Sequence, residues 1–176
     1  LPRFWVLETV MHECSRRDQV PYDAWCRDGW ITAIPGDVID YEWIYRQIDE
    51  DAQRYDLQEI GFDRWGAAAI YLWMANRGMT VVQIGQGYAS MSAPMKELEK
   101  LIVSRGLAHG DNPVLTWMAY NMVAMRDAAG NVKPDKKNSG EKIDGLVAMI
   151  MGLARATLHD PDALRSVYDQ RDVREL

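Results

Sequence analysis

Two acidic residues, Asp63 and Asp144, have the sequence surroundings that metal-assisted phosphodiester chemistry requires. Asp63 ends the apolar run Leu57-Gln-Glu-Ile-Gly-Phe-Asp63, and Asp144 opens the apolar segment Lys142-Ile-Asp-Gly-Leu-Val-Ala-Met-Ile150. A folded α/β domain can bring together a carboxylate at a strand end and another in the first turn of a helix. Such oxygen donors suit a hard divalent cation, which activates water against a phosphodiester. The pair therefore predicts metal-dependent nuclease chemistry.

Each of these carboxylates also has a purely structural interpretation. Asp63 can cap a helix that begins just after it, and Asp144 gains roughly 0.3–1 kcal/mol from the dipole of its own helix. The case for chemistry at Asp144 is its neighbourhood. Ile143, Val147 and Ile150 are expected to face inward, which places this carboxylate at the edge of a buried face. A carboxylate at such an edge is costly unless it is paired or bound to a metal.

Basic residues provide the second set of candidates. Four lysines precede Asp144, namely Lys133, Lys136, Lys137 and Lys142. They are either a solvated loop or a set of phosphate contacts, because ammonium groups beside a cation site hold a DNA backbone without reading its sequence. His109, in Gly106-Leu-Ala-His-Gly110, can be a metal ligand, a proton donor or a loop histidine that ties down its own turn.

The composition bounds what the chain can do. Its 176 residues, 48% hydrophobic and 26% charged, predict one globular domain over residues 1–158 and a charged tail over 159–176. The net charge of −6 argues against a non-specific DNA coat, although bound cations can supply local positive charge to a nuclease. No apolar run approaches the roughly 20 residues of a membrane span, and no GxxxxGK[ST] motif indicates ATP hydrolysis. Cys14 and Cys26 lack metal-ligand spacing and are expected to be free thiols, with a single disulfide as the alternative.

Strands and helices alternate along the chain and must position these residues. The central prediction is a strand-helix-strand unit, with strands over 57–62 and 80–84 and a helix over 65–76, which makes the strands parallel. Ligands gather beyond the carboxyl ends of such strands, where Asp63 lies. Other predicted elements are a strand over 4–7, an irregular segment over 8–24, a tight turn at Asp28-Gly29, helices over 41–55, 92–104, 113–125 and 141–158, and a loop over 128–140 with Gly130-Asn131 as a turn.

Four blocks of sequence carry a family resemblance through their order and spacing. They are Ile60-Gly-Phe-Asp-Arg-Trp65, Ser92-Ala-Pro-Met-Lys-Glu-Leu-Glu99, Ala108-His-Gly-Asp-Asn-Pro-Val-Leu-Thr-Trp117 and Lys142-Ile-Asp-Gly-Leu-Val-Ala148. In this order they resemble consecutive blocks of the large terminase subunit of tailed bacteriophages. The resemblance covers about residues 1–156 and corresponds to the C-terminal nuclease part of that subunit.

The resemblance implies a fold, an activity and a set of partners. The fold is α/β, a ribonuclease H-like mixed sheet flanked by helices. The activity is that of a metal-dependent endonuclease which cleaves concatemeric viral DNA at the initiation and termination of packaging. Asp63 and Asp144 match the family's second and third acidic ligands to a two-metal site for Mg²⁺ or Mn²⁺. The implied partners are double-stranded DNA, the portal protein, the small terminase subunit and the ATPase domain of the same subunit, in the cytoplasm of the infected host and transiently at the procapsid portal.

One family feature has no counterpart in this chain. The family's first acidic ligand lies on the opening strand of the sheet, which is expected just upstream of Leu1, and no residue here matches that motif. The expected fold therefore lacks its first strand. The resemblance then implies weak metal binding and little cleavage by these 176 residues alone. The alternative function is a catalytically inert fragment that acts as a docking module for portal, small terminase subunit or DNA.

Overall fold

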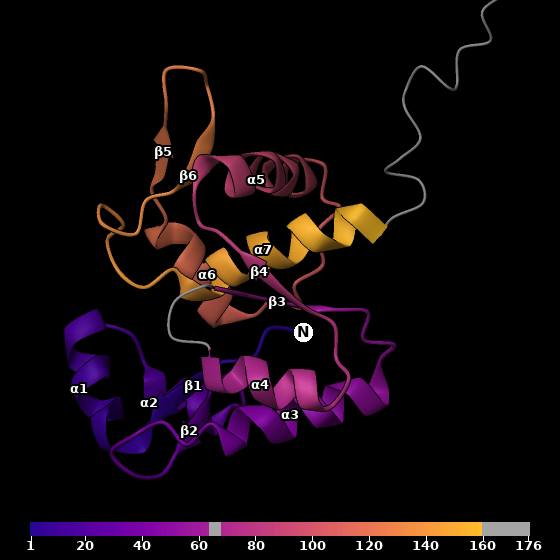
Figure 1. The fold of residues 1–176 in the computed structure, drawn as a ribbon. Helices are drawn as coiled ribbons and strands as arrows, with labels where there is room; N and C mark the ends of the chain where they lie inside the picture. The colour runs from indigo at the N-terminus through magenta and orange to yellow at the C-terminus, as the bar shows by residue number, and fades with distance from the viewer. Residues whose placement is uncertain (64–67, 160–176) are drawn as a thin grey trace, which may run out of the picture.

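The computed structural model describes residues 1–63 and 68–159, with helices and strands alternating along the chain (Figure 1). In chain order the elements are β1 (Trp5–Leu7), α1 (Glu8–Asp18), α2 (Tyr22–Arg27), β2 (Thr32–Ile34), α3 (Glu42–Arg54), β3 (Ile60–Asp63), α4 (Ala68–Asn76), β4 (Val81–Ile84), α5 (Tyr88–Val103), α6 (Pro113–Asn121), β5 (Ala124–Arg126), β6 (Val132–Pro134) and α7 (Asp144–His159). The predicted α/β class is confirmed.

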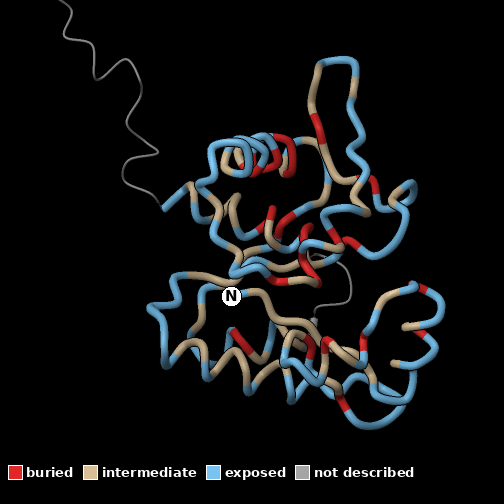
Figure 2. Tube along the Cα trace, turned by 180° about the vertical axis from the view of Figure 1, so that it is seen from behind, coloured by how far each residue is buried: buried red, intermediate tan, exposed pale blue. Residues whose placement is uncertain are grey.

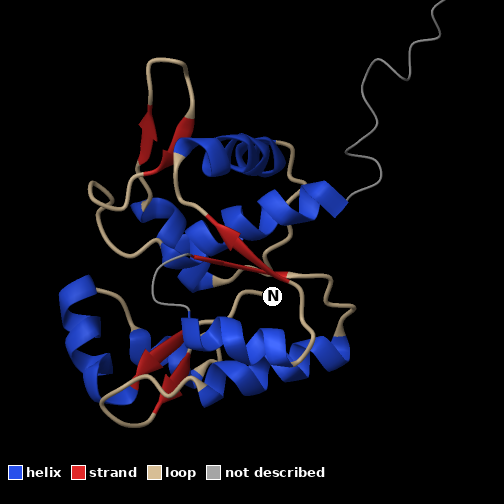
Figure 3. Cartoon of the chain, viewed as in Figure 1, coloured by secondary structure: helices blue, strands red, loops and turns tan. Residues whose placement is uncertain are grey.

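The described strands form three separate pairs (Figure 3). β1 pairs with β2 and β3 pairs with β4, both in parallel, whereas β5 and β6 form an antiparallel hairpin. The β3–β4 pair, connected through α4, is the predicted strand-helix-strand unit. Its register sets Asp63 opposite Ile84, so both strands end at the same edge.

The apolar faces of α5, α6 and α7 build most of the core. Leu146, Val147, Ile150 and Met151 form the buried stripe of α7, at the three- and four-residue spacing of a helix face. Full burial of one such side chain stabilises the fold by roughly 1.5–3 kcal/mol. Figure 2 shows buried positions along the inward sides of these helices, whereas the tip of the β5–β6 hairpin is exposed. The first half of α7 is therefore held by the core.

The segment over 8–24 differs from its prediction, because most of it is helical. The buried residues of α1 are Cys14 and Asp18, so its sequence lacks the periodic apolar stripe that indicates a helix. α2 buries Tyr22 and Trp25, whose rings pack against Trp117 of α6. The predicted tight turn at Asp28-Gly29 follows α2 rather than joining two strands.

Three later boundaries also differ from prediction. α5 begins at Tyr88, so Pro94 lies inside the helix instead of at its start. α6 ends at Asn121, and the β5–β6 hairpin replaces the end of the predicted helix and part of the predicted loop. Asp127 closes that hairpin by accepting the backbone N–H of Asn131 at 2.8 Å, beside Gly130 at φ 79°. α7 begins at Asp144 and not at residue 141.

Two expectations drawn from composition concern the described residues. Cys14, which is buried, and Cys26, which is partly buried, are both free thiols, as predicted. Among the helices of residues 1–63 and 68–159, none combines the length and the apolar character that a membrane span needs. The predicted tail over 159–176 lies outside the described residues apart from His159, the last residue of α7.

Candidate metal and nucleic-acid site

Asp63 is the last residue of β3, at the carboxyl edge of the parallel strand pair. Its carboxylate is partly buried and accepts a hydrogen bond from Nε2 of Gln86 at 2.8 Å. Gln86 follows the end of β4, so both polar side chains extend beyond the same sheet edge. The start of the helix that Asp63 was predicted to cap, at residue 65, lies outside the described residues. Among the described residues, the hydrogen-bond partner of the Asp63 carboxylate is the uncharged amide of Gln86.

Asp144 occupies the first turn of α7, as predicted, but its environment differs from the prediction. Ile143, Val147 and Ile150 are buried as expected, whereas the Asp144 side chain is 70% exposed. The reason is that the buried stripe of α7 runs through Val147 and Ile150, and the first residue of the helix lies to the side of it. Its carboxylate forms an ion pair with Nζ of Lys136 at 2.9 Å.

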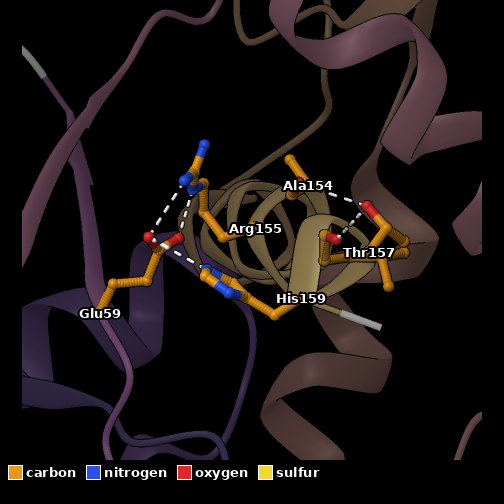
Figure 4. A network of polar contacts seen from close by, with 6 residues as sticks. Glu59, Ala154, Arg155, Thr157 and His159 are labelled. Atoms are coloured by element: carbon orange, nitrogen blue, oxygen red, sulfur yellow. Dashed lines mark hydrogen bonds and ion pairs between the residues drawn. The ribbon is translucent and has the colours of Figure 1, made fainter. Parts of the chain in front are cut away.

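α7 packs on β3, and the two elements run in opposite directions (Figure 1). At one end, Glu59 just before β3 forms ion pairs with Arg155 and His159 in the last turns of α7 (Figure 4). At the other end, the carboxyl edge of β3 lies on the same side of the fold as the start of α7 (Figure 1). This arrangement brings the segments that carry Asp63 and Asp144 to one side of the domain.

The candidate ligands are of the type that a divalent cation prefers, but they are too few to hold it by themselves. Asp63 and Asp144 are carboxylates, the ligand type that Mg²⁺ and Mn²⁺ prefer. The described residues contain no group of three or more His, Cys, Asp or Glu side chains positioned to hold a metal ion. The two carboxylates instead have separate partners, Gln86 and Lys136. This part of the chain therefore supplies at most part of a two-metal site.

Two of the four predicted basic residues lie beside Asp144 at the start of α7. Lys136 pairs with Asp144, and Lys142 lines the same 190 Å³ cavity as that carboxylate. Lys133, on β6, lies over the ring of Tyr88 at 5.1 Å from its centroid. Lys137 contributes its backbone N–H to the turn described below. Of the four lysines, Lys136 and Lys142 thus lie beside Asp144, whereas Lys133 lies against α5.

The lysine loop is held by Asp135, a residue that was not among the candidates predicted from sequence. Its buried carboxylate accepts Nδ2 of Asn138 at 2.7 Å and the backbone N–H groups of Lys137 and Asn138 at 3.2 Å. The hydrogen bond from the Asn138 side chain is the main cause that holds the pKa of Asp135 below its usual value. The signal available in the sequence is an Asp followed three residues later by Asn, a pattern typical of a side-chain-closed turn.

His109 lies between two adjoining apolar cavities of 470 and 540 Å³. Its Nδ1 atom is buried and has no hydrogen-bond partner among the described residues, so this atom does not tie down its own turn. His109 also belongs to no described group of potential metal ligands. Its predicted auxiliary role stays a prediction.

The structure is an α/β domain in which Asp63 lies beyond a parallel strand pair and Asp144 begins α7 beside Lys136. The family described as terminase large subunit, endonuclease domain, matches residues 4–160. The chain belongs to this family, which confirms the resemblance predicted from its sequence blocks.

Two curated proteins and one solved structure extend this result. The chain is 37% identical to the terminase, large subunit, of Enterobacteria phage HK97 over 162 residues, which cover 88% of this chain and 31% of that protein. It is 34% identical to Protein YmfN of Escherichia coli (strain K12), over 99% of this chain and 40% of that protein. The crystal structure of the HK97 bacteriophage large terminase is similar with a TM-score of 0.78 at 35% identity, over 86% of this chain and 32% of that one. The chain thus spans about a third of the length of these relatives.

Proposed function

We propose that this domain is the metal-dependent DNA endonuclease of a viral DNA-packaging terminase, which cleaves concatemeric genomic DNA when packaging starts and ends. Membership of the terminase endonuclease family supports the reaction class. One observation supports the site in particular. The carboxyl edge of β3, where Asp63 lies, and the first turn of α7, which holds Asp144, are on the same side of the packed β3–α7 unit.

In this proposal Asp63 and Asp144 hold Mg²⁺ or Mn²⁺ together with further ligands that the described residues do not supply. The bound ions would polarise the scissile phosphate and lower the pKa of an attacking water. Gln86 holds the Asp63 carboxylate in place through its amide N–H. Lys133, Lys136, Lys137 and Lys142 would contact backbone phosphates, which positions DNA without sequence preference.

The same proposal names partners and a location. Double-stranded DNA is the substrate, and the lysines beside Asp144 are the part of an otherwise acidic domain that suits it. The relatives are about three times as long as this chain. This difference fits a domain that works with the ATPase domain of the same subunit, the small terminase subunit and the portal protein. We place it in the cytoplasm of the infected host, transiently at the procapsid portal.

A plasmid-cleavage assay with Mn²⁺ tests the assignment of the two carboxylates. Asp63→Asn and Asp144→Asn preserve side-chain shape and remove the charge that a metal requires. Each is expected to lower the cleavage rate at least about 100-fold, because metal ions supply several kcal/mol of transition-state stabilisation. Asp37→Asn, an exposed carboxylate on a loop, is the matched control and should cleave like the parent. Measurable cleavage that is equal in all four proteins would exclude Asp63 and Asp144 as ligands.

A second candidate function is a docking module for portal, small terminase subunit or DNA. Two observations favour it: the described residues lack a three-donor group, and the net charge is −6. A Mn²⁺ titration followed by electron paramagnetic resonance separates the candidates. The nuclease proposal expects saturable binding that Asp63→Asn and Asp144→Asn weaken. Binding that is absent, or equal in the parent and both variants, together with no cleavage, would favour the docking module.

A further inference from the structure

Gly145, the residue after Asp144, lies in an unusually tight contact. A Cβ atom at this position would lie 2.8 Å from Cζ of Phe4 and 2.9 Å from Sδ of Met118, with Cε1 of Phe4 closer still. Ordinary van der Waals contact begins near 3.4 Å. The first turn of α7 can therefore rest against these two side chains only because residue 145 has no side chain.

The neighbours of Gly145 belong to the core, so a methyl group at residue 145 requires their side chains or the start of α7 to shift. Phe4 packs against the core, and its carbonyl oxygen accepts the backbone N–H of Thr32 at 2.8 Å. Met118 is 7% exposed in α6, and its Sδ accepts the Gly145 N–H at 3.2 Å. This last contact also satisfies one of the backbone donors that every helix start leaves without an intrahelical partner.

We propose that Gly145 is a positioning residue for Asp144: its missing side chain lets the start of α7 settle on Phe4 and Met118, which sets where the adjacent carboxylate lies. The inference rests on the proposed function, in which Asp144 is a metal ligand. Asp144, Gly145, Phe4 and Met118 line one 190 Å³ cavity, so a shift of the first turn moves the carboxylate relative to β3. Metal and catalytic sites need their groups within about 0.5 Å of the productive position.

Gly145→Ala is the direct test, and Gly152→Ala on the same helix is its matched control. A Cβ at position 152 would meet no atom within 4 Å, so this control adds the same methyl group to α7 without a clash. We expect Gly145→Ala to weaken Mn²⁺ binding at least tenfold, because a misplacement of about 1 Å can cost about 100-fold in function. Gly152→Ala should bind Mn²⁺ within twofold of the parent.

Two further measurements separate positioning from a general loss of structure. The affinity of Gly145→Ala for DNA without metal should stay within twofold of the parent, since the lysines lie outside the shifted turn. The double variant Phe4→Leu, Gly145→Ala replaces the ring that the new methyl group would strike, and Mn²⁺ affinity should return to within threefold of the parent. Where Gly145→Ala does not fold, this double variant replaces it, and a folded double variant that binds Mn²⁺ ten times more weakly than the parent would overturn the proposal.

Asp144→Asn in the same titration distinguishes this inference from the proposed function. Weakened binding by Asp144→Asn together with parental binding by Gly145→Ala would overturn the positioning role alone. Parental binding by both variants would overturn the metal assignment of Asp144, and the positioning role with it. Weakened binding by both, with recovery in the double variant, is the result that we expect.

Discussion

The carboxylates at the two ends of the contact between β3 and α7 differ in burial and in the charge of their partners. Where β3 starts, the Glu59 side chain is only 8% exposed and accepts hydrogen bonds from Arg155, whose Nη2 lies at 3.0 Å, and it forms an ion pair with Nε2 of His159 at 3.2 Å (Figure 4). Where β3 ends, the partner of Asp63 among the described residues is the Gln86 amide, and that of the largely exposed Asp144 is Lys136.

This difference separates the contact of Glu59 with Arg155 and His159, which we call the anchor, from the carboxylates of Asp63 and Asp144, which are available to a ligand. The Arg155 hydrogen bond is the main cause that lowers the pKa of Glu59 to about 2, so this carboxylate serves to hold α7 on β3. An exposed pair such as Lys136–Asp144 contributes at most about 1 kcal/mol. In the proposed function a metal ion would therefore displace Lys136 at little cost, whereas displacing Arg155 would leave the buried Glu59 carboxylate without its main partner.

The largest expected effect comes from removing the anchor. Arg155→Ala leaves the Glu59 carboxylate buried without its main partner, and we expect a clear fall in the free energy of unfolding. The loss stays below that of a fully buried pair because the Arg155 side chain is 29% exposed. Urea unfolding measures it, with Arg16→Ala on the exposed side of α1 as the control, expected within about 0.5 kcal/mol of the parent. Equal loss in both variants would contradict the anchor.

The pH dependence of stability gives a smaller effect at the same end. The folded-state pKa of Glu59 is about 2, below its ordinary value of 4.5. Its contribution to stability is therefore complete above pH 4.5 and is lost as the pH falls toward 2. We expect the stability difference between the parent and Glu59→Gln to narrow over this range. Thermal unfolding at successive pH values measures this stability difference. A difference that stays constant with pH would show that the protonation of Glu59 is not coupled to unfolding.

The same comparison shows which parts of the molecule local sequence could predict. The β3–α4–β4 unit follows from apolar runs and from Gly78, whose φ of 72° suits the end of a helix, so its parallel pairing and the strand-end place of Asp63 were predictable. The helical character of α1 and α2 was not, because it depends on distant packing, with the ring of Tyr22 6.3 Å from that of Trp117.

For the candidate site, the sequence indicates the two carboxylates but not the residues that contact them. Asp63 and Asp144 stand out by their position at the ends of apolar segments. Their partners do not, because Gln86 and Lys136 have no pattern that ties them to a particular carboxylate. The anchor is the extreme case: Glu59 and Arg155 are 96 residues apart, and only the packing of α7 on β3 brings them together. Local periodicity predicts elements and strand ends, whereas pairings between elements depend on the tertiary fold.

The smallest expected effect lies where β3 ends and α7 begins, because Lys136 and a metal ion would compete there for Asp144. Lys136→Met removes this competitor and keeps the aliphatic stem, so the Mn²⁺ concentration at half-saturation should fall about threefold, in line with an exposed pair worth less than about 1 kcal/mol. Lys137→Met is the matched control, since the ammonium of Lys137 has no bonded partner among the described residues. It should leave Mn²⁺ binding unchanged while weakening DNA binding as much as Lys136→Met does, because each removes one cation from the loop. A rise in the half-saturating Mn²⁺ concentration for Lys136→Met would mean that this lysine holds Asp144 in place for the metal, and the Lys136–Asp144 ion pair would then be a structural contact like the anchor.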